Sequence, residues 1–546
     1  MKRKAVAAVL TAVMVASMFT GCGSDNGSSS AKSASAASAA SAANDTVDED
    51  GKVNGIMYQE GLPLVDEGDY TFSIFCDDSS ESGEFIMLDE FKKQTNVDVD
   101  LKIYPYETAT ERLNLDLNSG DYADVIGGWT FSDNAILTYG VNQGVFIPLE
   151  DYFEKYCPNI SAILDLPGVR EKMTAPDGHI YTIPYVCTDT TVGYSPYINT
   201  KWLENVGMSM PTTTDEFEAV LKAFKEQDAN GNGDASDEIP FSTDPNNKHI
   251  EAMAGYFGLP MNKLGIAIQN EKVVYGGVSD TYREFLSWFH KLYAEGLVDV
   301  ELYTQDSSTW EGKGNQDLYG VSIAYGSNEF TGIPAAEERG DFDSMPVLNT
   351  DKDGIWLRDT EGFSVYRTQA VITNKAEHPE IICRWFDNAF ALENGIGCNR
   401  GPVGVIVNKE DDGYHAIDTT TLSEEDQEKY SWGNLWPQSL PKYLPVDFEF
   451  VEEHPMYDEK KATEEAYEAN LTKEIIPSYW IDLDKIDTFS DTNTAIKDFF
   501  EQQQAQFVCG ELDIDNDADW QAYVDGMYSL GLEDWVATQG IEEIAK

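Results

Sequence analysis

The sharpest chemical pattern in this sequence of 546 residues is an acidic stretch at positions 228–238. Oxygen-bearing side chains occupy its first, third and fifth positions and a glycine its sixth, as in the calcium-binding loop of an EF-hand. The twelfth position is Ile239, so the bidentate glutamate of an EF-hand is absent and the last two acids would have to complete the cage. All candidate donors are oxygens, which favours Ca2+ in a structural role. The expected ligands are Asp228, Asn230, Asn232, Asp234, Asp237 and Glu238. The alternative is a solvated Asn-Gly turn.

A second acidic series lies at positions 513, 515, 517 and 519. It lacks the central glycine and directly precedes a helical pattern. It is therefore predicted to be a loop that caps a helix rather than a metal site.

No catalytic constellation stands out in the sequence. Segment 320–324 only half-resembles a nucleophile elbow, because it ends in Ala and has the pattern of a strand. Phosphate loops, zinc-protease motifs and dinucleotide fingerprints are absent. A pair of catalytic carboxylates stays open in a chain with 97 acidic residues, and it would make the protein a glycan-active surface enzyme. We predict instead that the protein is not an enzyme.

The charge balance limits the partners of the protein. The formal net charge is -60, from 97 acidic against 37 basic residues. Such a field repels nucleic-acid phosphates and anionic lipid headgroups, so no nucleic-acid partner is expected and any membrane attachment must come from a lipid. Beyond Cys22 six cysteines remain, without CxxC or zinc spacing. Their even number permits disulfides, but their wide separations favour buried free thiols.

The N-terminus has the pattern of an export signal. Basic residues 2–4 precede an uncharged apolar run from 5 to 19, which has the length of a signal-peptide core. The Gly21-Cys22 junction resembles the lipobox of bacterial lipoproteins, in which cleavage before the cysteine leaves an acylated N-terminus. We predict a signal peptide at 1–21, a lipid on Cys22 that anchors an extracytoplasmic protein to the cell membrane, and a disordered tether over 22–58. The alternative is an ordinary secretory signal with a chance cysteine.

From residue 70 onward, strand and helix periodicities follow one another. Apolar residues alternate over 70–74, recur at helical spacing over 85–91 and alternate again over 97–103, which predicts a βαβ unit in a parallel sheet. A third short strand, 124–126, runs into Gly127-Gly128-Trp129. Because ligands bind beyond the carboxyl ends of such strands, Asp77, Asp78 and Trp129 are expected to face one crevice.

Three amphipathic stripes predict helices that pack in the core. They lie at 217–224, 285–293 and 520–528, and their aromatic residues are assigned to packing rather than to ligand contact.

Six segments resemble, in order, the extracellular solute-binding proteins of family 1, which are the lipoprotein receptors of sugar-type ABC importers. The similarity covers essentially the chain from 70 to 544. The segments are 119–126 (SGDYADVI), 177–185 (DGHIYTIPY), 197–203, 211–217, the loop that begins at 228, and 517–532. One departure is Gly-Pro-Val-Gly at 401–404, where many members carry Gly-x-Glu-Gly, so an acidic contact at Val403 is in question.

The resemblance implies an α/β fold of the two-lobed, periplasmic-binding-protein-like type II, with the ligand cleft between the lobes. The expected lobes are 59–187 with 372–432, and 188–371 with 433–546. Hinge rotation around the ligand is the expected mechanism.

The resemblance also implies a function. The protein is expected to be a monomeric receptor that binds a carbohydrate, specifically an oligosaccharide, and delivers it to the permease subunits of an ABC transporter. Sugar faces pack on aromatic rings and sugar hydroxyls bond to carboxylates. The expected ligand contacts are therefore Trp129, Asp77, Tyr185 and Tyr325. The alternative is a receptor for a peptide or another non-sugar solute.

Overall fold

The computed structural model describes residues 45–545, apart from 78–83, 130, 246–248, 333–340, 418, 446–447, 449 and 452–454. The predicted signal peptide, the lipid site at Cys22, tether residues 22–44 and Asp78 lie outside the described residues. Within the described part of the chain, no helix combines the length and the apolar character needed to cross a membrane.

A four-stranded sheet in the order β14-β5-β3-β4 organises the first lobe. Its strands are β3 (Tyr70–Asp77), β4 (Val97–Tyr104), β5 (Val125–Gly127) and β14 (Ala370–Ile372). β3 pairs in parallel with β4 and β5, whereas β14 runs antiparallel to β5. Helix α1 (Ile86–Thr95) connects β3 to β4, which confirms the predicted βαβ unit. Because β14 comes from far along the chain, it carries Gln369 next to the loop that follows β5.

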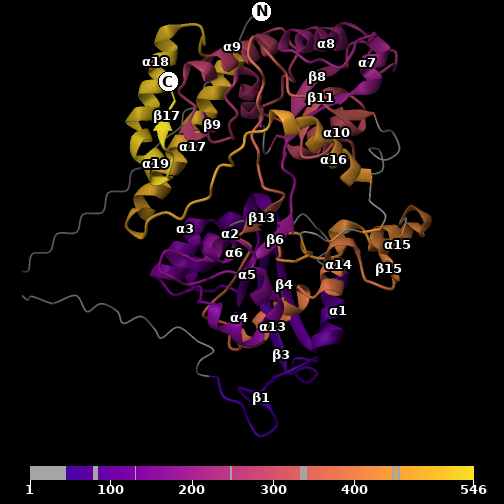
Figure 1. Ribbon diagram of the computed structural model, residues 1–546, viewed down its shortest axis with the longest axis vertical. Helices are drawn as coiled ribbons and strands as arrows, with labels where there is room; N and C mark the ends of the chain where they lie inside the picture. Colours follow the sequence, from indigo (N-terminus) through magenta and orange to yellow (C-terminus); the bar gives the residue numbers. More distant parts are fainter. Residues whose placement is uncertain are drawn as a thin grey trace, which may run out of the picture. The chain divides into compact units, whose positions relative to one another are not determined.

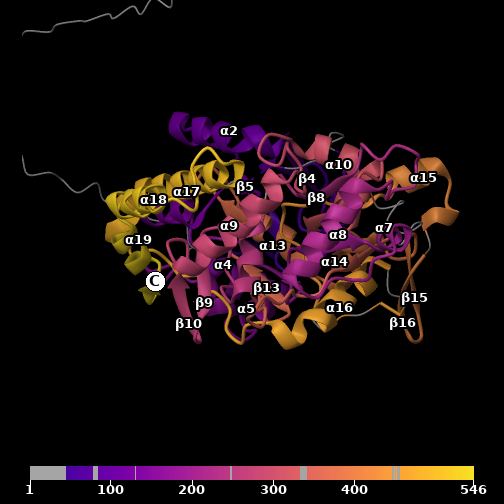
Figure 2. The same ribbon diagram turned by 90° about the horizontal axis from the view of Figure 1, so that it is seen from above.

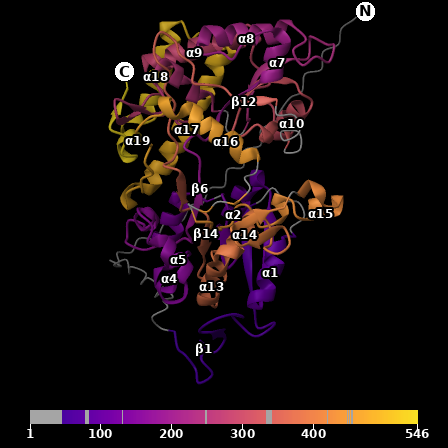
Figure 3. The same cartoon turned by 45° about the vertical axis from the view of Figure 1, so that its right-hand side comes forward.

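Helices complete the first hydrophobic core. The indole of Trp385 contacts the rings of Phe91 and Trp436, at centroid distances of 5.6 and 5.7 Å. Trp385 lies on α13 (Pro379–Ala389), which packs beside α1 although the two are far apart in the sequence (Figures 1 and 3). The other elements of this lobe are α2 (Tyr106–Ser119), α3 (Asp133–Ala135), η2 (Ile136–Asn142), α4 (Glu150–Tyr156), α5 (Pro158–Leu164), α6 (Val169–Met173), α14 (Leu392–Arg400), β15 (Val407–Glu410), β16 (Gly413–Ala416), η4 (Thr419–Thr421), α15 (Glu424–Lys429) and η5 (Trp432–Asn434).

A second four-stranded sheet, in the order β12-β7-β11-β8, organises the second lobe. Its strands are β7 (Ser195–Asn199), β8 (Ile239–Thr243), β11 (Tyr319–Ala324) and β12 (Phe342–Ser344). A smaller sheet contains β9 (Ile266–Gln269), β10 (Lys272–Tyr275) and β17 (Glu543–Ile544). The remaining elements are α7 (Thr200–Val206), η3 (Ile250–Phe257), α10 (Ser307–Asn315), α11 (Asn328–Thr331), α16 (Pro455–Tyr467), η6 (Glu468–Asn470), η7 (Leu483–Lys485), α17 (Ile486–Cys509) and α19 (Leu532–Thr538).

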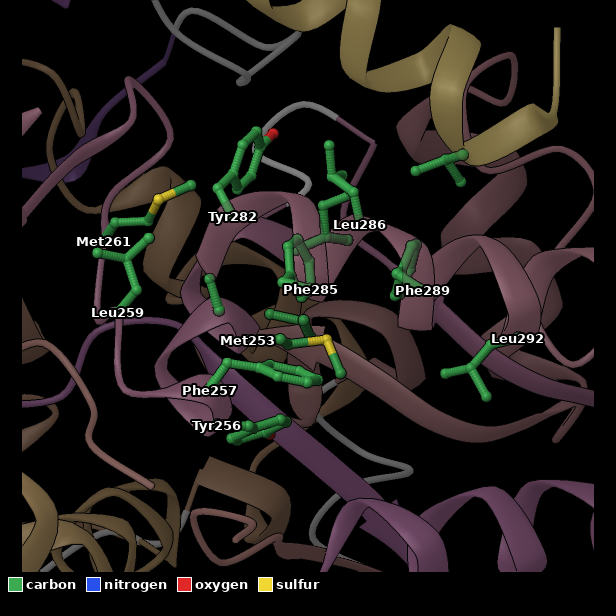
Figure 4. Close-up of a cluster of buried hydrophobic side chains, with 14 of the residues drawn as sticks. Met253, Tyr256, Phe257, Leu259, Met261, Tyr282, Phe285, Leu286, Phe289 and Leu292 are labelled. Atoms are coloured by element: carbon green, nitrogen blue, oxygen red, sulfur yellow. The ribbon is translucent and has the colours of Figure 1, made fainter. Parts of the chain in front are cut away.

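The three predicted amphipathic stripes are confirmed as helices with buried faces. They form α8 (Thr214–Glu226), α9 (Asp280–Ala294) and α18 (Asp517–Ser529). Figure 4 shows Phe285 of α9 close to Met253 and Phe257 of η3 within the second core. The C-terminal α17 lies alongside α9 (Figure 2), so the end of the chain closes a core that begins near Val192.

The two cores set lobe boundaries that differ from the expected ones. Val53 and Met57, on the hairpin of β1 (Lys52–Val53) and β2 (Met57–Tyr58), are buried in the first core, so the tether does not extend to residue 58. Trp436 and Leu440 belong to the same core, although the second lobe was expected to begin at 433. Ala370 of β14 belongs to it as well. These side chains stand in short segments without a clear strand or helix period, so the sequence did not indicate their burial.

A two-stranded ribbon lies near two of the expected lobe boundaries, at 187/188 and 371/372. It pairs β6 (Tyr185–Thr188) with β13 (Phe363–Tyr366) in antiparallel register, with Tyr185 opposite Tyr366. Val186 on β6 is part of the first core, whereas Val192 a few residues later is part of the second. The ribbon therefore joins the two cores.

Candidate solute-binding site

Trp129 stands on a tight loop at the carboxyl end of β5. Gly128 has a φ of 133° and lies against Asp77, so a Cβ there would overlap the Asp77 carboxylate. The Asp77 side chain accepts a hydrogen bond from the backbone N–H of Trp129 at 3.0 Å, and Gly128 donates its N–H to the carbonyl of Gln369 at 2.8 Å. The indole consequently remains 45% exposed. Asp77, one of the four expected ligand contacts, is fully buried in this structure, and its carboxylate supports the loop.

Two tyrosines from the ribbon complete an aromatic platform, which we define as Trp129, Tyr185 and Tyr366. The ring of Trp129 meets Tyr366 edge-on at 5.3 Å and Tyr185 at 6.3 Å. Tyr185 and Tyr366 stack on each other at 5.6 Å because they are register partners on β6 and β13. Burial raises the pKa of both tyrosines, so their hydroxyls are neutral donors at neutral pH.

Asp189 connects this platform to Tyr325 at the end of β11. Its carboxylate accepts hydrogen bonds from the hydroxyls of Ser364, at 2.5 Å, Tyr366, at 3.2 Å, and Tyr325, at 3.4 Å. The Tyr325 ring is 36% exposed. Three of the four predicted contacts, Trp129, Tyr185 and Tyr325, are therefore brought into one network of rings and hydroxyls.

A buried lysine and several acids surround Tyr325. The Lys460 ammonium lies 3.8 Å from the centre of the Tyr325 ring and donates to the carbonyl of Gly193 at 2.8 Å. Burial lowers the pKa of Lys460 to about 8, although nearby carboxylates oppose that shift. Burial likewise raises the pKa of Glu329, which accepts the backbone N–H of Tyr325, to about 7, and that of Asp359 to about 6.

The raised pKa of Glu329 gives a testable pH dependence of stability. A glutamate in the unfolded chain titrates near 4.3, so the folded state favours the protonated form and loses stability as pH rises from about 4.5 through 7. Glu329→Gln stays neutral and is expected to raise the melting temperature at about pH 8 while changing it little at about pH 4.5. The exposed Glu361→Gln serves as the control. An equal gain at both pH values would show that the carboxyl does not titrate in this way.

A second exposed tryptophan, Trp432, lies beside the ammonium group of another buried lysine, Lys442. Lys442, only 4% exposed, lies 5.2 Å from the centre of the Trp432 ring, whose residue is 53% exposed. Burial raises the pKa of Cys187, whose thiol neighbours the Tyr185 hydroxyl, to about 12, and the charge of Lys442 opposes that shift. Trp432 is therefore linked through Lys442 to the platform side of β6.

Sequence reasoning missed Tyr366, Asp189, Lys460 and Trp432. Trp432 lies at the expected lobe boundary between 432 and 433, in a stretch rich in proline and aromatic residues, and that composition could have suggested it. The other three became visible only when β6, β13 and α16 were placed together.

The acidic loop after α8 keeps two carboxylate oxygens buried. Gly233, with a φ of 96°, donates its N–H to one oxygen of Asp228 at 3.0 Å, and the amides of Asn230 and Asn232 donate to Asp237 at 3.2 and 2.8 Å. Among the described residues, the other oxygen of Asp228 and one oxygen of Glu238 are buried without a hydrogen-bond partner. Burial raises the pKa of Glu238, and repulsion from Asp237 adds to that shift. Unpaired buried carboxylate oxygens facing a loop of amides fit a hard cation.

The second acidic series forms the predicted capping loop. The Asn516 side chain caps α18 by accepting the N–H of Ala518 at 3.0 Å. Asp515 accepts the hydroxyl of Ser287 at 3.0 Å, and Asp519 accepts the N–H of Asp513 at 3.2 Å. Its carboxylates are therefore engaged by protein donors.

The half-matching nucleophile motif is a strand, as predicted. Ser322 is fully buried in β11, and its hydroxyl accepts the indole N–H of Trp310 at 3.2 Å. A solute has no path to that oxygen. The six cysteines in the described part of the chain are free thiols, and four of them are buried.

Two α/β lobes joined by a two-stranded ribbon, with exposed aromatics where the chain crosses, define the class of two-lobed binding proteins. Residues 78–395 match a family model described as bacterial extracellular solute-binding protein. The fructooligosaccharide ABC transporter substrate-binding protein FusA of Streptococcus pneumoniae serotype 4 is 31% identical over 411 residues, which are 73% of this chain and 70% of FusA.

Solved structures of FusA show the same fold. FusA in complex with kestose has a TM-score of 0.76 at 26% identity. A FusA EF-hand mutant in complex with fructo-nystose has a TM-score of 0.74 at 27% identity. Each comparison covers 86% of this chain and 98% of the solved chain. The chain belongs to the bacterial extracellular solute-binding proteins.

Proposed function

We propose that the protein is an extracytoplasmic receptor that binds an oligosaccharide and delivers it to an ABC importer. The observation that carries this proposal is the aromatic platform, in which the exposed Trp129 rests against the half-buried Tyr185 and Tyr366 and is joined through Asp189 to Tyr325 of the second lobe. The similarity to FusA, whose name assigns it to fructooligosaccharide import, supports it.

The groups at this site suit a sugar. The C–H face of a sugar ring packs on an exposed indole, and tyrosine hydroxyls and carboxylates can pair with sugar hydroxyls as donors and acceptors. Groups from both lobes take part, since Trp129 follows β5 and Tyr325 follows β11. Closure of the lobes about the ribbon would then enclose the solute, and the protein would act as a monomer that presents its closed form to the permease subunits.

The charges around Tyr325 favour an uncharged oligosaccharide over a polyuronate. Asp189, Glu329 and Asp359 outnumber Lys460 among the described groups around Tyr325, and burial raises the pKa of Glu329 and Asp359 because a negative charge is poorly solvated there. Lys460 already covers the Tyr325 ring, so an added carboxylate on the solute would meet more acids than cations.

Calorimetry with the purified full-length protein tests the proposal. Kestose is the neutral probe, trigalacturonate the anionic one, and a mixed tripeptide set represents the alternative class of solute. Saturable binding of the neutral sugar without release of shorter products supports the proposal. If only peptides bind, the protein is a peptide receptor and the proposal fails. Release of shorter sugars would favour the enzyme alternative.

We propose further that the mature protein begins at an acylated Cys22. Cys22→Ala is expected to move the protein from the membrane fraction to the soluble fraction and to remove the lipid mass, because the anchoring energy comes from buried acyl methylenes at about 0.8 kcal/mol each. Cell fractionation with intact-mass analysis measures both effects. A Cys22→Ala protein that stays membrane-bound and is processed normally would contradict the proposal.

The acidic loop is proposed to hold one structural Ca2+. The residues that would hold the ion are Asp228, Asn230, Asn232, Asp234, Asp237 and Glu238. When bound, the ion would supply positive charge to carboxylates that the described protein groups leave partly unpaired. The solved structure of a FusA EF-hand mutant supports the comparison, since its name assigns an EF-hand to that relative.

A further inference from the structure

Arg367 directly follows the platform tyrosine Tyr366 and is 6% exposed. Its guanidinium forms a two-pronged ion pair with Asp133, with Nε to Oδ1 at 2.8 Å and a terminal nitrogen to Oδ2 at 2.5 Å. Asp133 starts the short α3, four residues after Trp129. Arg367 therefore holds the far end of the loop whose near end is held by Asp77.

The same guanidinium also holds a segment from the C-terminal part of the chain, residues 479–486, which we name the strap. Arg367 donates to the carbonyl of Tyr479 at 3.0 Å and lies 4.0 Å from the centre of the Trp480 ring. The Trp480 indole N–H donates in turn to the carbonyl of Lys172 at 3.3 Å. The strap runs directly into α17, which belongs to the second core.

An apolar contact reinforces this connection. Leu137 is fully buried and forms a small cluster with Ile481 and Ile486 of the strap. Leu137 lies on η2, a π-helix that directly continues α3. Such helices are rare and occur often at functional sites. The segment is thus attached to the strap at Asp133 by charge, through Arg367, and at Leu137 by packing.

We propose that Arg367 is a positioning residue for solute binding, which couples the Trp129 loop to the strap through Asp133. This proposal rests on the proposed function of the platform. Within the described part of the chain, the contacts of Arg367 are with Asp133, Lys172 and the strap, so it acts by fixing the loop and by making loop and strap move as one unit. A planar guanidinium can bond a carboxylate in two places and still donate to a carbonyl, which a lysine cannot do.

A double-mutant cycle with the full-length protein and kestose tests this role. Arg367→Ala is expected to weaken binding about tenfold, and Arg367→Lys to recover only part of that loss. In a Trp129→Ala background, Arg367→Ala should change the affinity by less than about twofold, because the residue acts through Trp129. Arg358→Ala is the matched control, since Arg358 bonds the Thr472 carbonyl and pairs with Glu468. A full effect of Arg367→Ala in the Trp129→Ala background, or an equal effect of Arg358→Ala, would overturn the proposal.

Hydrogen exchange without any solute tests the coupling separately. Arg367→Ala, or Asp133→Asn if that variant does not fold, should speed exchange in peptides from both 128–142 and 479–486, while Arg358→Ala should change neither. Faster exchange in only one of the two segments would overturn the coupling. If wild type does not bind kestose while both segments respond, the assignment of the solute fails and the coupling of the Trp129 loop to the strap stands.

Discussion

Trp129→Ala is expected to weaken oligosaccharide binding by about 5- to 150-fold, which corresponds to about 1–3 kcal/mol. The indole is held open by the Gly128 backbone and the buried Asp77, and its edge rests on Tyr366. Because its position is fixed before the solute arrives, little conformational entropy is lost when a sugar ring stacks on it. Calorimetry with the oligosaccharide that binds wild type measures the effect.

The control for this substitution is Tyr528→Ala, which removes another exposed aromatic ring, from α18 in the second lobe. The melting temperatures of both variants should stay close to that of wild type, since neither ring is buried. An unchanged affinity of Trp129→Ala would show that the platform does not contact the solute.

Removal of Ca2+ by a chelator is expected to lower the melting temperature by about 5–10 °C. A cation present at a hundredfold excess over its dissociation constant stabilises the folded state by about 2.7 kcal/mol. The structural reason is the pair of buried, unpartnered oxygens on Asp228 and Glu238 in a loop that follows α8 and leads into β8. Differential scanning calorimetry with and without chelator, together with elemental analysis, measures the effect.

The matched control uses the other acidic loop. Asp228→Ala with Asn230→Ala should abolish the response to chelator, whereas Asp513→Ala with Asp515→Ala should leave it intact, because the second loop is engaged by protein donors. If wild type contains no bound ion and its melting temperature does not change with chelator, the first loop is only a polar turn. Loss of solute binding at an unchanged melting temperature would assign the ion to the binding site instead.

Sequence periodicity predicts the strands and helices that bury one face along their whole length. The βαβ unit of β3, α1 and β4 and the helices α8, α9 and α18 all carry long apolar stripes, and each was found as expected. Trp129 was predicted for a related reason, because a glycine pair after a short strand marks the carboxyl edge of a sheet.

The residues that the sequence did not reveal depend on pairing between distant segments. Tyr366 joins the platform only because β13 returns beside β6, and Lys460 reaches Tyr325 only because α16 packs against the second sheet. The loop contact of Asp77 was not foreseen, because a carboxylate at the end of a strand can face solute or support a loop, and the sequence does not show how the Gly128 backbone lies against it. The lobe boundaries failed for the same reason, since Trp436 has no local pattern that assigns it to the first core.

The antiparallel strand β14 has a consequence for how the chain folds after export. The first sheet needs Ala370–Ile372 at its edge, and the first core needs Trp385 and Trp436 in its interior, so the lobe that leaves the membrane first cannot finish folding until most of the chain has followed. The second lobe likewise requires α17 for its core and β17 for its small sheet, and both come from the C-terminal part of the chain. Closing such long loops is slow, because their entropy must be lost before the distant contacts form. Because each core includes segments from distant parts of the chain, we expect neither core to be complete until the C-terminal segments have been exported.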